Sequence, residues 1–272
     1  MNLFLPSRYD ELVTRLALGI EPAEPLHGGR LPFRVEVARD GVPLPPAVPQ
    51  RDPAASPWAG QDVLPRVERR RASRWAVRLG AGVKDPLDLR LWDPSMRRVP
   101  RRLRVRLAPP PPLPDPSGRV IRPALWPGPA YDLPAGAMGC RGIVRRGGRP
   151  MRWTRVEARR LDDATRVVAT AHGDERGEFL LILGPRAVSG AELTLPVLLS
   201  VTVFGPDTAP DPATDPSSKV DPLWDLPLEE VPLAGFDEVL AGTALPPGYR
   251  AGATRNVSFG PDGLAGEQFV FT

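Results

Sequence analysis

The chain has 272 residues, a net charge of +4 at pH 7 and a hydrophobic fraction of 42%, which is enough for a core and excludes wholesale disorder. Its 37 prolines and 26 glycines follow no Gly-X-Y period, so collagen is excluded, and this much proline disfavours helices. We expect an all-β protein with two antiparallel β-sandwich-like domains, a proline-rich connector and long irregular arms.

The first predicted domain covers residues 1–107. Within residues 11–20, Leu12, Thr14, Leu16, Leu18 and Ile20 share one face at a period of two, which favours a strand over the alternative of a short helix. Four later segments alternate apolar with charged residues, mostly arginine: 33–38, 75–79, 87–92 and 103–107. This pattern predicts antiparallel strands with one apolar face on a core and one charged face in solvent.

The predicted connector covers residues 108–136. Its sequence PPPPLP favours an extended, semi-rigid polyproline II spacer. The alternative is a ligand for an SH3-like partner, but no basic residue stands immediately beside the PxxP motif, so we favour the spacer. Trp126 and Tyr131 are the expected docking points of this segment.

The second predicted domain covers residues 137–205, with a short strand at Ile143–Val144 and a buried strand in the sequence EFLLIL. Between strands lies HGDERGEF, which is either an acid–base centre around His172 or a tight turn. Asp174 can bond its own backbone and Gly177 can take a positive φ, as a turn requires. The only other histidine, His27, belongs to the first predicted domain, so we interpret the segment as a turn.

Residues 139–183 resemble the carboxypeptidase regulatory-like family, which has a prealbumin-like β-sandwich fold. The resemblance rests on an ordered set of small, turn-forming and core residues: Gly142, Val144, Gly148, Pro150, Val156, Ala158, Asp174, Gly177 and Phe179. It implies a non-catalytic module for stability, adhesion or assembly. Among these residues we expect Gly142, Gly148, Pro150, Asp174, Gly177 and Phe179 to define the turns of the fold.

The final predicted segment, residues 206–272, is an acidic extended arm that ends in short strands at Val257–Phe259 and Phe269–Thr272. Residues 207–238 hold nine acidic residues against Lys219 alone. Such an arm cannot bury enough of itself to be ordered alone, so it stays disordered or lies on a partner. Its terminal sequence FVFT is typical of a strand inside a sheet.

Arginine is concentrated in residues 66–74, 96–106 and 141–155, and Lys84 and Lys219 are the only lysines among the 36 basic residues. We favour codon usage in a GC-rich genome as the explanation, and the alternative is selection for bidentate contacts to carboxylate or phosphate. Because the charges nearly balance, we expect subunit contacts or pairing with the acidic tail rather than nucleic-acid binding. The candidate interface residues are Arg145, Arg146, Arg149, Trp153, Asp211, Asp215, Asp221 and Trp224.

The sequence contains no motif for catalysis, a metal or a cofactor, and we expect none of the three. Cys140, the single cysteine, is expected to be a buried small hydrophobe. The first residues do not read as a secretory signal, and no apolar run is long enough for a membrane span, so we expect a cytoplasmic protein or one in a particle assembled there.

We therefore expect a non-catalytic structural or assembly subunit of a large particle, of the phage-tail-like or contractile-injection type. Its partners would be other protein subunits or copies of itself. One alternative is a carbohydrate- or protein-binding sandwich module, for which the candidate aromatic row is Trp75, Trp92, Trp126, Trp153 and Trp224. A further alternative is an enzyme of unrecognised type.

Overall fold

The computed structural model describes residues 16–26, 29, 31, 35–40, 67–70, 74–78, 83–107, 116–133, 137–184, 196–208, 214–215, 221, 223–232, 236–238, 244–259 and 264–271. Within these ranges the regular elements are strands and one short 3-10 helix, η1 (Pro116–Arg119). The protein is all-β, and most strand pairs are antiparallel. No helix in the described part of the chain is long and apolar enough to cross a membrane.

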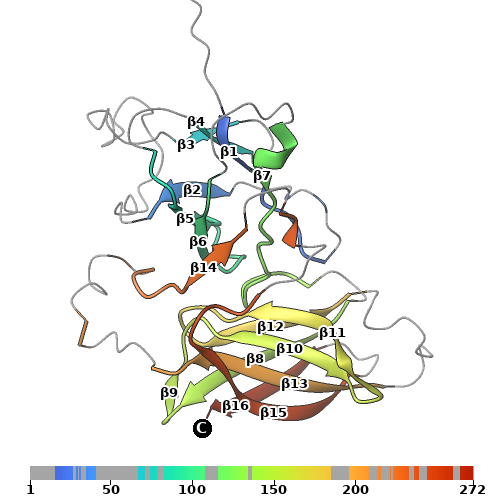
Figure 1. Ribbon diagram of the computed structural model, residues 1–272. Helices are drawn as coiled ribbons and strands as arrows, with labels where there is room; N and C mark the ends of the chain where they lie inside the picture. Colours follow the sequence, from blue (N-terminus) through green and yellow to red (C-terminus); the bar gives the residue numbers. More distant parts are fainter. Residues whose placement is uncertain are drawn as a thin grey trace, which may run out of the picture.

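Two four-stranded sheets form the upper group in Figure 1, with the orders β3-β4-β1-β7 and β14-β6-β5-β2. Their strands are β1 (Leu16–Ile20), β2 (Glu36–Arg39), β3 (Val67–Arg69), β4 (Trp75–Arg78), β5 (Leu87–Trp92), β6 (Arg101–Val105), β7 (Val120–Ile121) and β14 (Leu228–Val231). The two sheets share one core, in which Leu18, Val77, Leu89 and Leu103 are fully buried.

The alternation seen in the sequence accounts for this core. Leu87, Leu89 and Leu91 of β5 are buried, as predicted for the apolar face. Residues 16–20 form a strand, so the helical alternative is wrong there, whereas Leu12 and Thr14 lie outside the described residues.

The second pair of sheets forms a sandwich below the upper group, with the orders β11-β10-β13-β15 and β12-β8-β16, and β9 beside β8. Its strands are β8 (Met138–Arg146), β9 (Arg149–Pro150), β10 (Arg155–Arg160), β11 (Asp163–His172), β12 (Glu178–Leu183), β13 (Val197–Pro206), β15 (Tyr249–Phe259) and β16 (Leu264–Phe271). Both sheets contribute to a separate core that contains Cys140, Val156, Phe179 and Phe269.

The stretch from Asp174 to Gly177 is a turn, as predicted. The Asp174 carboxylate accepts hydrogen bonds from the backbone N–H groups of Arg176 (2.8 Å) and Glu178 (2.9 Å), and Gly177 has a φ of +73°. Gly148 also has a positive φ, whereas Gly142 lies inside β8 opposite Phe179 and not in a turn. The short strand expected at Ile143–Val144 is part of the longer strand β8 (Met138–Arg146), which pairs with both β12 and β16.

Replacing Gly177 with alanine is expected to destabilise the protein by about 2 kcal/mol or more, because strain and a backbone clash combine. A Cβ at Gly177 would lie 2.8 Å from the Val144 carbonyl oxygen and 2.9 Å from the Met151 nitrogen. Gly148→Ala is the matched control, because its φ is +79° but a Cβ there meets nothing within 4 Å. Urea unfolding of both variants checks the difference, and equal losses would contradict it.

The predicted connector is not a free strut over its described part. Residues 120–121 form β7, which pairs in parallel with β1, and Ile121 and Leu125 are fully buried in the upper core. Residues 108–115, which hold the PPPPLP run, lie outside the described residues. Packing of the apolar sequence after residue 119 therefore extends the upper group beyond the predicted boundary at 107.

The C-terminal segment is not an appended arm. β14 adds to the edge of β6 in the upper group, whereas β15 and β16 are long strands of the sandwich (Figure 1). Residue 205, the predicted boundary, lies inside β13 (Val197–Pro206), which pairs with β15. The expectation that the chain ends inside a sheet is confirmed, because β16 pairs with β8 up to Phe271. The burial of Phe269 and Val257 explains why these strands join the core.

Candidate functional site between the sandwich and the upper group

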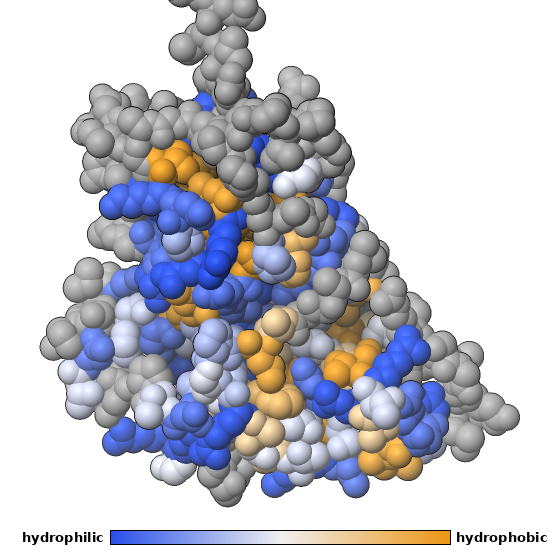
Figure 2. Space-filling view, viewed as in Figure 1, coloured by the Kyte–Doolittle hydropathy of each residue, from blue (hydrophilic) through white to orange (hydrophobic). Residues whose placement is uncertain are grey.

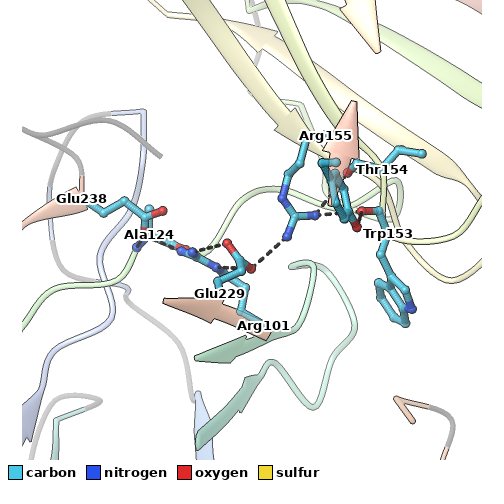
Figure 3. A network of polar contacts seen from close by, with 8 residues as sticks. Arg101, Ala124, Trp153, Thr154, Arg155, Glu229 and Glu238 are labelled. Atoms are coloured by element: carbon cyan, nitrogen blue, oxygen red, sulfur yellow. Dashed lines mark hydrogen bonds and ion pairs between the residues drawn. The ribbon is translucent and has the colours of Figure 1, made fainter. Parts of the chain in front are cut away.

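The most concentrated chemistry in the described part lies where β14 and β6 of the upper group meet β10 of the sandwich. The Glu229 carboxylate lies between two guanidinium groups (Figure 3). Arg101 Nη2 donates to Glu229 Oε2 at 2.7 Å, and Arg155 Nη2 donates to Glu229 Oε1 at 2.8 Å. One carboxylate thus joins a strand of each group.

A second carboxylate completes this network. Arg101 also donates to Glu238 and to the Ala124 carbonyl oxygen (2.8 Å), and the Ala124 N–H donates to Glu238 at 2.8 Å. Two anions and two cations, Arg101, Arg155, Glu229 and Glu238, therefore balance in a buried place, and we call them the junction network. Such mutual neutralisation is what buried charges require.

The electrostatics follow from burial and pairing. Burial by itself would raise the pKa of Glu229, but the charges of Arg101 and Arg155 outweigh this and hold that pKa below its usual value. Burial opposes the charge of Arg101, yet Glu229 and Glu238 raise the pKa of that guanidinium. Glu229 and Arg101 therefore stay ionised, and Glu229 is not available as a proton acceptor.

Local sequence explains the two arginines differently. Arg101 stands two residues before Leu103 and four before Val105, so the period of β6 turns it to the buried face. Arg155 is on the outer face of the sandwich, and contact with Glu229 covers it. The predicted solvated charged face is therefore wrong for Arg90, which is buried, and Arg101 and Arg155 are buried as well.

The acidic segment pairs with arginines of its own chain. Asp221 bonds to Arg90, Asp237 bonds to Arg122, and Asp225 makes two bonds to Arg152 (2.5 and 2.7 Å). Figure 2 shows hydrophilic surface across the middle of the visible face. The interpretation of the arginines as a complement to the chain's own acidic residues is thus the one the contacts support.

The predicted interface residues do not come together as one surface. Trp153 is buried and its Nε1 donates to Asp225, and Asp221 is used by Arg90. The other described members lie elsewhere or are half-buried: Arg145, Arg146 and Arg149 on the β8–β9 hairpin, then Asp215 and Trp224. Asp211 lies outside the described residues.

The candidate aromatic row is also absent from the described surface. Trp75 and Trp153 are buried, and Trp92, Trp126 and Trp224 are half-buried. Sugar binding by stacking on these five residues is therefore not supported by their exposure. Trp126 instead packs against His172 in a tilted arrangement, with ring centroids 5.4 Å apart, and Tyr131 lies under the Arg98 guanidinium at 4.5 Å, so both residues do dock the segment.

His172 lies at the end of β11 and not in the turn. It is fully buried, and neither ring nitrogen has a hydrogen-bond partner among the described residues. Burial, followed by the nearby charges of Arg155 and Arg101, lowers the pKa of His172 well below 6.5. The imidazole is therefore neutral in the folded protein. No sequence pattern predicted that His172 is buried, because the acidic residues that follow it in the sequence belong to the turn and not to the strand.

Acidification is expected to destabilise the protein through His172. Below pH 6.5 the His172 imidazole binds a proton in the unfolded chain but stays neutral in the folded protein. The free energy of unfolding therefore falls on acidification, by up to about 1.4 kcal/mol per pH unit. Above pH 6.5 the imidazole is neutral in both states and does not affect stability. Denaturant titrations between about pH 5 and 7 measure how the free energy of unfolding changes with pH. The His172→Gln variant should lose the part of this dependence that comes from one proton bound on unfolding. His27→Gln is the control, and a wild-type slope in the His172 variant would refute the assignment.

Beside the junction network, a groove of about 380 Å³ opens between the upper group and the sandwich. Its walls combine proline, aromatic and charged residues: Arg104, Arg152, Trp153, Pro206, Asp225, Pro227, Leu228, Glu230, Pro247 and Tyr249. Burial raises the pKa of Tyr249 to about 12, so its hydroxyl stays protonated and donates to the Trp153 carbonyl oxygen at 2.7 Å.

The described side chains include no group of three or more His, Cys, Asp or Glu placed to hold a metal ion. Cys140 is buried in the sandwich core, as expected. The strongest carboxylate cluster is neutralised by guanidinium groups, so what it can do chemically is hold two parts of the chain together. Comparisons with known proteins give no lead beyond this: no family model, no curated protein and no solved structure matches the chain.

Proposed function

We propose that this protein is a non-catalytic structural subunit that assembles with other protein subunits, including copies of itself, into a large particle. The particle would be of the phage-tail-like or contractile-injection type, built in the cytoplasm. In this proposal two sandwich-like units act as one block, with the segment after residue 107 and the acidic C-terminal segment as ties rather than free arms.

The observation that carries the proposal is the path of the C-terminal segment. The chain leaves the sandwich at β13, contributes β14 to the upper group, and returns to the sandwich for β15 and β16. The junction network lies where these paths meet. Such crossing favours a fixed orientation between the two groups, as a load-bearing subunit needs.

The resemblance of residues 139–183 to carboxypeptidase regulatory-like domains agrees with this proposal, since that family implies a non-catalytic module. The matching positions Val144, Val156, Ala158 and Phe179 are all fully buried in the sandwich core. They thus serve packing, and packing is the role that the resemblance implies for them.

Sedimentation of the tagged protein in lysate of its native cell, with mass spectrometry of co-sedimenting proteins, tests the proposal. We expect migration as a megadalton particle together with tube, sheath or baseplate proteins, whereas a tagged cytoplasmic protein of similar mass stays near the top of the gradient. Migration near the 29.5 kDa mass of one chain would overturn the proposal.

A further inference from the structure

Several buried polar atoms gather at one place beside the junction network. Trp126 Nε1, Thr154 Oγ1 and both ring nitrogens of His172 are shielded from solvent and take part in no hydrogen bond within the described part of the chain. Thr154 and His172 are fully buried, and Trp126 is half-buried with its Nε1 covered. Buried polar groups of folded proteins nearly always have a partner, so these atoms indicate that something binds among them.

The contacts of these residues place their polar atoms together. The ring centroids of Trp126 and His172 are 5.4 Å apart. Gly173, the next residue, lies so close to Thr154 that a Cβ on the glycine would meet Thr154 Oγ1 at 2.2 Å. Arg155, whose Nε is also buried without a partner among the described residues, is paired with His172 across β10 and β11. Four side chains with unused donors or acceptors therefore border one site.

Their hydrogen-bonding capacity fits water better than an ion. Trp126 Nε1 and Arg155 Nε can only donate, whereas the Thr154 hydroxyl and a neutral imidazole can each donate and accept. Water both accepts and donates, so it can serve all of them. A small anion would use only the donors, and it would add an uncompensated charge, because the two cations and two anions of the junction network already balance.

We propose that this site binds ordered water, which links Trp126 of the upper group to Thr154 and His172 of the sandwich. Trp126 belongs to the upper group because the preceding residue, Leu125, is fully buried in the upper core. Buried water typically makes about three hydrogen bonds to otherwise unpaired groups, and the side chains around this site can supply that number. The water is then a second tie between the two groups of sheets, beside the ion pairs of the junction network.

The Thr154→Val variant tests the site by the sign of its effect, because it removes the hydroxyl and nearly keeps the shape of the side chain. If water bonds to Oγ1, we expect the unfolding equilibrium constant to rise about fivefold, which corresponds to the loss of one hydrogen bond. If the hydroxyl has no partner, its removal eliminates an unpaired buried group and stabilises the protein instead. Urea unfolding of the full-length protein at pH 7 measures the change.

Thr170→Val is the matched control, because Thr170 lies on β11 two residues before His172 but is only half-buried. It should change the unfolding equilibrium constant by about twofold at most. An unchanged or greater stability of Thr154→Val would overturn the proposal.

A high-resolution crystal structure of the full-length protein tests the site directly, and it decides the question if Thr154→Val does not fold. We expect an oxygen peak within about 3.2 Å of Trp126 Nε1 and of one His172 nitrogen. Electron density without a peak between these atoms would overturn the proposal. An anomalous peak there in bromide-soaked crystals would overturn it in favour of a small anion. The inference is independent of the proposed function, because it concerns a site inside one chain.

Discussion

Replacing Glu229 with alanine is expected to lower the free energy of unfolding by about 3–5 kcal/mol. The change removes the anion between Arg101 and Arg155 and leaves two buried guanidinium groups without their common partner. Glu238, the carboxylate that remains in the network, bonds to Arg101 but not to Arg155. Urea unfolding at pH 7, monitored by tryptophan fluorescence, measures the loss.

Glu230→Ala is the matched control, because it changes the neighbouring residue of the same strand. Its side chain is exposed and feels the charge of Arg104 only across solvent-exposed surface, so its effect should stay within about 0.5 kcal/mol. If the two variants unfold at the same urea concentration, Glu229 does not hold the junction as described.

Replacing Phe269 with alanine is expected to lower the free energy of unfolding by about 3–5 kcal/mol, although only three residues follow it in the sequence. Its side chain is fully buried in the sandwich core and lies 5.6 Å from the ring of Phe179, between ring centroids. The loss would come from removed apolar contacts and from the cavity that remains. Thermal and urea unfolding both measure it.

Leu198→Ala serves as the comparison, because Leu198 belongs to the same sandwich but is 51% exposed, and it should cost less than about 1 kcal/mol. A similarly small effect of Phe269→Ala would mean that β16 does not contribute to the core. It would instead support the sequence-based prediction of an extended C-terminal arm.

The sequence predicted strands wherever a period of two was clear, and turns wherever Asp and Gly occupied turn positions. Leu87, Leu89 and Leu91 are examples of the first, and Asp174 with Gly177 of the second. These features depend on neighbours a few residues apart. The all-β class follows from them together with the proline content.

The junction network could not be predicted in the same way. Glu229 meets Arg101 across 128 positions and Arg155 across 74, and no local pattern announces such pairs. Composition alone made the acidic segment look unable to fold, because its burial depends on arginines elsewhere in the chain. One signal was present: Arg101 falls on the apolar face of its strand by the period of two.

Differential scanning calorimetry of the full-length protein tests most directly whether the C-terminal segment joins the two groups of sheets into one block. We predict a single transition whose calorimetric and van't Hoff enthalpies agree, because β14 and the junction network couple the two cores. Glu229→Ala should separate this transition into two or broaden it. Two well-resolved transitions in the wild-type protein would contradict the account.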